Sequence, residues 1–183
     1  MDSSKLSLDV KIKPTTPTDK MKIFDWLTNS NLTAEMLGEP KFPDNPIPSW
    51  KEFDKDYLSY YFDGTEPEKG RCFIIEYHDI EVGQINYNRV VDKTKTAEID
   101  IWLADKKYAG RGIGTAAIRH LCRHLFEYFD YKKIIIQPSG RNINAIKSYT
   151  KAGFVIQKNI PKGFELEYYD SVFMVLHNSA KFS

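Results

Sequence analysis

A glycine-rich turn between an expected strand and an expected helix constrains this chain more than any other feature. The turn is Tyr108-Ala109-Gly110-Arg111-Gly112-Ile113-Gly114, and it separates an alternating segment at 96–103 from an amphipathic one at 112–128. Glycines allow close backbone approach, so successive N–H groups near the positive end of a helix can point at one anion. The segment predicts a cradle for a phosphate or pyrophosphate, although a purely structural turn would have the same residues.

Two other phosphate-binding motifs do not fit this turn. A P-loop requires a lysine before the serine or threonine at the helix start, whereas Gly114 is followed directly by Thr115. The dinucleotide-binding fingerprint requires a third glycine at a spacing that Gly114 does not meet.

Hydrophobic periodicity predicts one α/β domain, residues 1–183, with a mixed sheet and no internal repeat or linker. Proline and glycine positions divide the periodic segments from one another. The expected strands cover 7–13, 72–77, 81–88, 96–103, 133–137, 154–157 and 172–176, and the expected helices start at Thr16 and cover 49–62, 112–128 and 142–152.

Composition excludes several functional classes. Lys plus Arg is 26 against 25 Asp plus Glu, which argues against a general nucleic-acid binder. No apolar run approaches the about 18 residues that a membrane span needs, and the polar start is not a signal peptide. Cys72 and Cys122 cannot form a disulfide framework and suit a reducing compartment. We therefore expect a cytoplasmic protein, monomer or homodimer, that binds neither nucleic acid nor membrane.

Charge is segregated along the chain. Acidic and aromatic residues gather in 39–68, whereas basic residues dominate 105–151. The first region would suit a cationic partner and the second an anionic one, although solvated surfaces would carry the same charges. His120 and His124 have a spacing seen in metal sites, but no third ligand is apparent, so we expect no metal.

The glycine turn and a second motif together carry a resemblance to a known family. Gly110-Arg111-Gly112-Ile113-Gly114, followed by the segment from Asn142 to Phe154, resembles the paired acetyl-CoA motifs of the GNAT superfamily of N-acetyltransferases. The resemblance implies acetyl-CoA as cosubstrate and no metal. It also implies the GNAT fold, an α/β domain whose mixed, mostly antiparallel sheet is splayed between the fourth and fifth strands and flanked by helices.

The resemblance assigns the cofactor-binding residues. The turn amides and Arg111 would hold the pyrophosphate, and the family's usual Arg or Gln at the start of the turn is Ala109 here. Asn142 would cap the second helix and contact the cofactor arm. The strand backbone at 102–103 would meet the pantetheine amides. The full set is Trp102, Leu103, Ala109, Gly110, Arg111, Gly112, Ile113, Gly114, Thr115, Asn142 and Ala145.

Two residues are assigned to the chemistry. Glu98 and Asp100 are two apart on one strand and so share a face, where each would raise the pKa of the other. We assign Asp100 as the base or amine anchor, since it lies nearer the glycine turn. Tyr149 matches the family tyrosine that donates a proton to the leaving thiolate. Solvent-facing acids and a packing tyrosine are the structural alternatives.

Within the family, the chain is similar to aminoglycoside 6'-N-acetyltransferases. Trp26-Leu27-Thr28, Ile74-Ile75-Glu76-Tyr77, Asp100 and Pro138 match that group, which often carries Asp where this chain has Gln137. Gln137 can hydrogen-bond an amine but cannot take its proton. The residues expected to contact the acceptor are Glu98, Asp100, Gln137, Glu165, Glu167 and Asp170.

The expected function is direct acetyl transfer, in a ternary complex, to a primary amine of an aminoglycoside-like polycation, as in antibiotic resistance. A peptide or ribosomal-protein N-terminus and a siderophore amine are alternative acceptors. A non-catalytic acyl-CoA-binding module is the alternative from another class.

Overall fold

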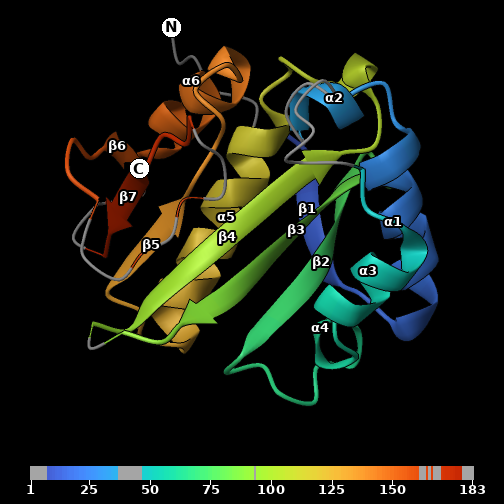
Figure 1. Ribbon diagram of the computed structural model, residues 1–183, viewed down its shortest axis with the longest axis horizontal. Helices are drawn as coiled ribbons and strands as arrows, with labels where there is room; N and C mark the ends of the chain where they lie inside the picture. Colours follow the sequence, from blue (N-terminus) through green and yellow to red (C-terminus); the bar gives the residue numbers. More distant parts are fainter. Residues whose placement is uncertain are drawn as a thin grey trace, which may run out of the picture.

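A central sheet with helices on both faces organises the chain (Figure 1). The computed structural model describes residues 8–36, 47–92, 94–160, 164, 166 and 170–178. Within these residues the sheet has seven strands in the order β1-β2-β3-β4-β5-β7-β6. The strands are β1 Val10–Pro14, β2 Gly70–Tyr77, β3 Ile80–Val90, β4 Thr96–Leu103, β5 Lys133–Ile136, β6 Val155–Ile156 and β7 Met174–His177.

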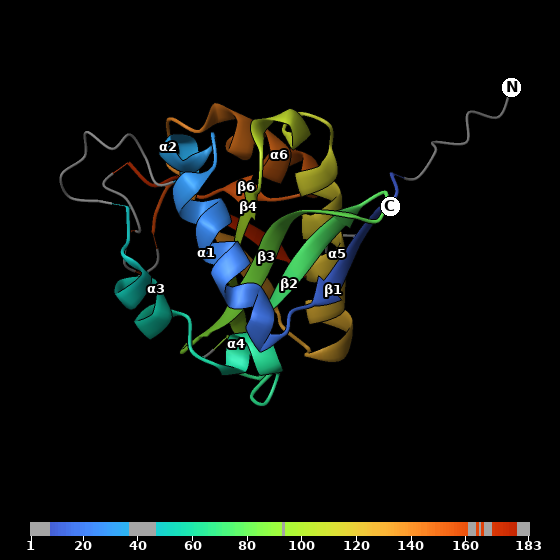
Figure 2. The same cartoon turned by 90° about the vertical axis from the view of Figure 1, so that its right-hand side faces the viewer.

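The helices divide between the two faces (Figure 2). The α-helices are α1 Lys20–Asn29, α2 Thr33–Met36, α3 Trp50–Asp56, α4 Tyr60–Asp63, α5 Ile113–Tyr128 and α6 Ile143–Ala152, with 3₁₀ turns η1 Pro17–Asp19 and η2 Lys106–Tyr108. Helix α5 packs on one face of the sheet, whereas α1, α3 and α4 lie on the other. In the described part of the chain, no helix is long and apolar enough to cross a membrane.

The side chains of β4 alternate between these two layers. Ala97 and Ile99 belong to the buried cluster beneath α5, whereas Trp102 belongs to the cluster beneath α1, α3 and α4. Because successive residues of a strand point to opposite faces, Glu98 and Asp100 share the α1 face with Trp102. The face that carries the acids is therefore covered by the helices of the N-terminal third.

The sheet is splayed between β4 and β5. These strands run parallel and pair only from Thr96 with Lys133 to Glu98 with Ile135, while β4 pairs with β3 along its whole length. Beyond Glu98, among the described residues, the β5-facing edge of β4 has no strand partner. This confirms the expected splay, and it leaves backbone N–H and C=O groups near residues 99–103 open to other partners.

One expected helix is wrong in extent. The segment 49–62 forms two short helices, α3 and α4, because the backbone leaves the helix at Tyr57. The Tyr57 ring stacks on the Phe53 ring, with 4.3 Å between ring centroids, and meets the Trp102 ring edge-on, with 6.2 Å between centroids. Helix α2 and the 3₁₀ turn η2 were not expected, and the remaining elements differ from their expected bounds only at their ends.

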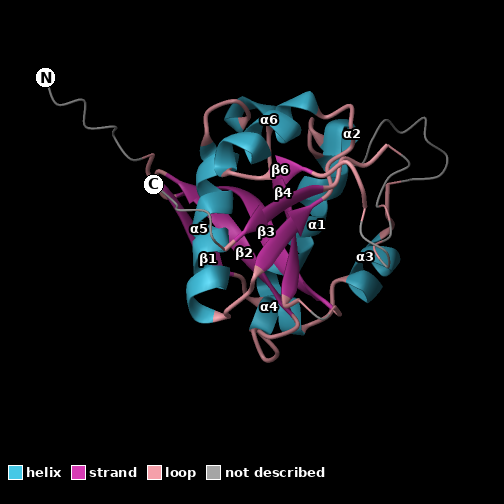
Figure 3. Cartoon of the chain, turned by 90° about the vertical axis from the view of Figure 1, so that its left-hand side faces the viewer, coloured by secondary structure: helices cyan, strands magenta, loops and turns pink. Residues whose placement is uncertain are grey.

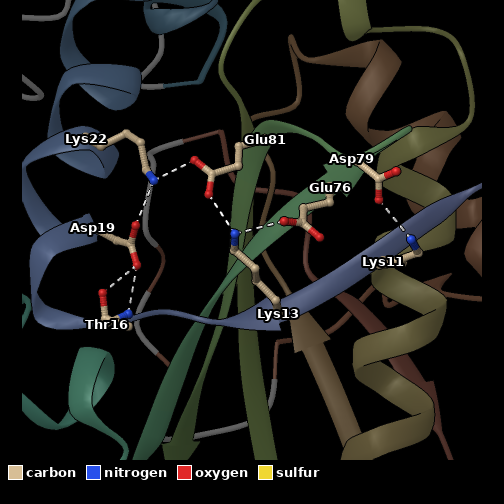
Figure 4. Close-up of polar contacts among 8 residues, drawn as sticks. All are labelled: Lys11, Lys13, Thr16, Asp19, Lys22, Glu76, Asp79 and Glu81. Carbon is tan, nitrogen blue, oxygen red and sulfur yellow. Dashed lines mark hydrogen bonds and ion pairs between the residues drawn. The ribbon is translucent and has the colours of Figure 1, made fainter.

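Ion pairs attach the start of α1 to the sheet (Figure 4). Lys13 of β1 lies 2.8 Å from both Glu76 and Glu81, on β2 and β3. Lys22 of α1 lies 2.6 Å from Glu81 and 2.7 Å from Asp19. Glu81 thus joins β1, β3 and α1, and the network fixes where α1 begins over the sheet.

Candidate active site

A pair of half-buried carboxylates on β4 forms the centre of the site. Glu98 and Asp100 both point to the α1 face. The Gln137 amide, just after β5, donates a hydrogen bond of 2.8 Å to Glu98. The structure therefore brings together three of the residues expected to contact an acceptor, at the point where β4 and β5 separate.

Burial changes the protonation of both acids. Desolvation and the nearby charge of Glu98 raise the pKa of Asp100 from 3.8 to about 7, against the effect of the Asn86 amide. Desolvation also raises the pKa of Glu98, against the effect of the Gln137 hydrogen bond. A carboxylate whose pKa lies near neutrality can take a proton from an ammonium group and later release it.

A chain of buried polar side chains lies beside these acids and was missed in the sequence. The Cys72 thiol donates to Oε1 of Gln84 at 2.8 Å, and Nε2 of Gln84 donates to Oδ1 of Asn86 at 3.1 Å. Asn86 is paired directly with Asp100 across β3 and β4. The only sequence signal was that Gln84 and Asn86 alternate with Ile85 and Tyr87, which is also typical of a solvent-facing strand.

Aromatic rings lie on the same sheet face as the acids. Tyr61 is buried, and desolvation raises its pKa, with a smaller contribution from the charge of Asp100, so the two groups lie near each other. Rings from α1, α3, α4 and β4 contact one another in a connected series that includes Tyr61, in edge-on, tilted and stacked pairs. This aromatic wall consists of Phe24, Trp50, Phe53, Tyr57, Tyr61 and Trp102.

Three acidic residues of region 39–68 are paired with other residues of the protein. Asp54 pairs with Lys20 at 2.6 Å, and Glu52 accepts hydrogen bonds from the backbone N–H and hydroxyl of Ser49 at 2.7 Å. Asp63 accepts from Thr65. Of region 39–68, Tyr61 lies near Asp100, while these three acids serve an ion pair, a helix cap and a turn.

The glycine turn has the geometry of an anion cradle. Gly110 and Gly112 have φ of +73° and +84°, and an added Cβ at either would meet no atom within 4 Å. Gly112 stands before the first turn of α5, where no side chain of the described residues caps the free N–H groups. Arg111 is exposed beside them. The residues present fit a pyrophosphate, which would accept hydrogen bonds from these amides.

The second motif lies against the first (Figure 3). Asn142 caps α6, because its Oδ1 accepts a hydrogen bond of 3.0 Å from the Ala145 N–H. The Thr115 and Ser148 hydroxyls lie 2.8 Å apart and join the first turn of α5 to α6. The cap on α6 is therefore confirmed, and the two helices that carry the motifs are in direct contact.

Tyr149 is not on the same face as Asp100. Its side chain is 8% exposed and belongs to the buried cluster beneath α5, with Ile113 and Ala117. The sheet therefore lies between Tyr149 and Asp100. A molecule that contacts both must lie along the β5-facing edge of β4, beyond Glu98, where the strands have separated.

The remaining expected acceptor residues are placed differently. Glu165 and Glu167 lie outside the described residues. Asp170 pairs with Arg141 at 3.1 Å and accepts a hydrogen bond of 3.0 Å from Ser139, so its charge is already compensated.

A family model described as "Acetyltransferase (GNAT) domain" matches residues 9–155. The ribosomal-protein-serine acetyltransferase of Escherichia coli is 29% identical over 87 residues, 48% of each chain. An aminoglycoside N(6')-acetyltransferase type 1 of Klebsiella pneumoniae is 40% identical over 62 residues, 34% of this chain and 31% of the relative. The matches thus cover about half or less of these curated relatives.

Solved structures resemble the chain over nearly its whole length. Aminoglycoside acetyltransferase AAC(6')-Ib in complex with coenzyme A has a TM-score of 0.70 at 22% identity, covering 92% of this chain and 95% of that one. Spermidine N-acetyltransferase of Vibrio cholerae in complex with coenzyme A and spermine has a TM-score of 0.70 at 20% identity, covering 93% and 96%. At these identities the likeness establishes the fold.

Proposed function

The chain belongs to the GNAT acetyltransferase family, and on this premise we propose that it transfers the acetyl group of acetyl-CoA to a primary amine of a small polycation. We further propose an aminoglycoside-like acceptor, acetylated at a 6'-type amine by direct transfer in a ternary complex. The observation that carries the proposal is the half-buried pair Glu98 and Asp100, placed where β4 separates from β5.

The acid pair supports an amine acceptor. An ammonium group is attracted by two adjacent carboxylates, and it must lose a proton before its nitrogen can attack a thioester. Asp100, with its pKa raised to about 7, accepts that proton near neutral pH. The Gln137 hydrogen bond favours the ionised form of Glu98, which adds a second negative charge beside the amine. The aromatic wall adds ring faces that favour cations.

The glycine turn supports acetyl-CoA as the donor. Amides of residues 110–115 and the Arg111 side chain bind the pyrophosphate, while the open edge of β4 hydrogen-bonds the pantetheine arm. Acetyl-CoA supplies the activated acyl group. The free amine then forms the new C–N bond as the C–S bond breaks, and Asp100 holds the proton that the ammonium group lost. Tyr149 donates a proton to the departing thiolate, and the second proton that the nitrogen loses on becoming an amide restores the Tyr149 hydroxyl.

An acceptor panel tests the proposal. Thiol release from acetyl-CoA is measured with kanamycin A, spermidine and a peptide that begins with serine, because one relative is a ribosomal-protein-serine acetyltransferase. The proposal predicts turnover with the polycationic small molecules above that with the peptide. Peptide acetylation alone would establish the second candidate, a protein N-terminus. Binding of coenzyme A without thiol release for any amine would contradict an enzymatic role.

A further inference from the structure

A buried row of three polar side chains, Cys72, Gln84 and Asn86, crosses from β2 to β3 and ends at Asp100 on β4. The Cys72 thiol donates to Oε1 of Gln84 at 2.8 Å, and Nε2 of Gln84 donates to Oδ1 of Asn86 at 3.1 Å. The Asn86 amide in turn hydrogen-bonds the Asp100 carboxylate. Apolar groups of the same shape in place of a buried hydrogen-bonded pair are often neutral for stability, so the buried row indicates a role beyond packing.

The thiol end of the buried row sets its direction. Burial raises the pKa of the Cys72 thiol well above its ordinary value of 9.0, while Arg71 and Asp19 act on it in opposite senses, so the thiol keeps its proton at neutral pH. A protonated thiol has one hydrogen to donate and a sulfur that accepts only weakly, so it selects the oxygen of Gln84. The nitrogen of Gln84 then faces the oxygen of Asn86, and the nitrogen of Asn86 is left for the proposed base.

The opposite direction would disfavour an ionised base. If both amides were turned, the oxygen of Asn86 would face the Asp100 carboxylate, and two acceptors would meet with no hydrogen between them. In the observed direction an N–H faces the carboxylate and favours its ionised form. The buried row therefore keeps the pKa of Asp100 below the value that burial and the charge of Glu98 alone would give.

The titratable groups that face Asp100 supply no opposing charge. Glu98, on the same strand, raises the pKa of Asp100. Tyr61 of α4 and Cys72 of β2 are both neutral near pH 7, because burial raises the pKa of each. Within the described part of the chain, the effect that lowers the pKa of Asp100 comes from the Asn86 amide.

We propose that Cys72, Gln84 and Asn86 are positioning residues for Asp100, which orient its carboxylate and favour its ionised form when an ammonium group arrives. This inference rests on the proposed N-acetyltransferase function, because Asp100 is the base of that reaction. The three side chains act through the carboxylate and not on the substrate. The Cys72 thiol, at the far end of the buried row, thus influences proton transfer without reacting itself.

The pKa of Asp100 in variants of Cys72 tests the proposal. An NMR titration follows the Asp100 carboxyl group in the protein without substrates, and the acidic limb of kcat/KM for thiol release is measured beside it. Cys72→Ala leaves Gln84 free to turn, so the pKa of Asp100 should rise by about half a pH unit or more, and the limb should move to higher pH. Cys72→Ser keeps a donor and should restore the wild-type value.

Cys122→Ala is the matched control. Cys122 is also fully buried, and burial also raises the pKa of its thiol, but it belongs to the cluster beneath α5 on the other face of the sheet. Its truncation should lower the melting temperature and leave the Asp100 titration unchanged. The same titration in Cys72→Ala and Cys122→Ala, with both proteins folded, would reduce Cys72 to a packing role and overturn the proposal.

Asn86→Leu removes the N–H at the carboxylate itself, so it should raise the pKa of Asp100 by about one pH unit. If no variant folds, the wild-type protein decides. The side-chain amide resonances of Gln84 should then change with the same midpoint as the Asp100 carboxyl group, because the buried row couples them. Gln84 resonances that stay constant through the Asp100 titration would overturn the proposal.

Thiol release separates this inference from the proposed function. An Asp100 titration unmoved in folded Cys72→Ala, in a protein that still acetylates amines, would overturn the positioning role and leave an N-acetyltransferase. No thiol release from acetyl-CoA with any amine would overturn the proposed function, and with it the role of the buried row in catalysis.

Discussion

The side-chain amide of Gln137 donates a hydrogen bond of 2.8 Å to Glu98. Glu98 is the last residue of β4 that pairs with β5, and Gln137 is the first residue after β5. The bond therefore joins the two strands where they begin to separate. It favours the ionised form of Glu98, and that charge raises the pKa of Asp100. Gln137 thus acts on the proposed base through an intermediate carboxylate.

This relationship predicts coupled pH profiles for Gln137 and Glu98. The acidic limb of kcat/KM reports the loss of the ionised base as pH falls. Glu98→Gln removes a charge that raises the pKa of Asp100, so the limb should move to lower pH. Gln137→Leu makes Glu98 easier to protonate, so it should move the limb in the same direction by less.

The double variant separates coupling from simple damage. With Gln already at position 98, Gln137→Leu should leave the limb where it is, because no carboxylate remains for the amide to stabilise. Independent, additive shifts would show that Gln137 does not act through Glu98.

Asp100→Asn should abolish most acetyl transfer. Asparagine cannot accept the proton of the amine, so kcat/KM should fall about 10²-fold or more at pH 8. Coenzyme A affinity, measured by calorimetry, should stay within about twofold, because the glycine turn is unchanged. Normal turnover of this variant with every acceptor would remove Asp100 from the mechanism.

The same substitution should stabilise the fold. The pKa of Asp100 is higher in the folded protein than the ordinary value of 3.8, so the folded state binds more protons than the unfolded one. Asp100 therefore lowers the free energy of unfolding as pH rises from about 4 to about 7. The gain in melting temperature on Asp100→Asn should be larger at pH 8 than at pH 4, and an opposite trend would contradict the raised pKa.

Arg111→Ala should weaken donor binding selectively. Loss of one exposed cationic contact of about 1 kcal/mol should raise the KM for acetyl-CoA about fivefold, with little change in the KM for the amine. Arg119→Ala is a matched control, since Arg119 is exposed on the same helix and bonds the Lys151 carbonyl. Equal effects of Arg111→Ala on both substrates would place this arginine elsewhere than at the pyrophosphate.

Glu81→Gln should reduce stability without altering the site. Hydrogen bonds from Lys13 and Lys22 hold the pKa of Glu81 below its usual 4.5, so its contribution is present above that pH and disappears as pH falls further. Because the groups are partly exposed, the loss should be about 1 kcal/mol or less at neutral pH. Denaturant unfolding gives the free energy of unfolding of the wild-type protein and of Glu81→Gln. The difference between the two should be smaller at pH 3 than at pH 7, and smaller at high salt than at low salt. A difference independent of pH would contradict this role.

The fold was predictable because its strongest signals are local. The alternating strand at Thr96–Leu103 and the amphipathic helix at 113–128 have the expected positions, and the paired motifs predicted the family and the splayed sheet. The break between α3 and α4 was not predictable, because the Tyr57 ring at the break meets Trp102 of β4, which is distant in the sequence.

The site was predictable only in part. Spacing alone placed Glu98 and Asp100 on one face, but which helices cover that face depends on the tertiary structure. Gln84 and Asn86 are buried by the N-terminal helices, although their alternation also suits an exposed strand. The position of Tyr149 on the α5 side likewise depends on how α6 packs, which periodicity does not report.

A structure of the protein with coenzyme A tests the central claim most directly. The account predicts the pyrophosphate on the amides of residues 110–115 and the sulfur at the open edge of β4, within reach of Asp100 from one face and Tyr149 from the other. A pyrophosphate bound away from Gly110 and Gly112, or a sulfur enclosed beneath α5 with β4 between it and Asp100, would contradict it.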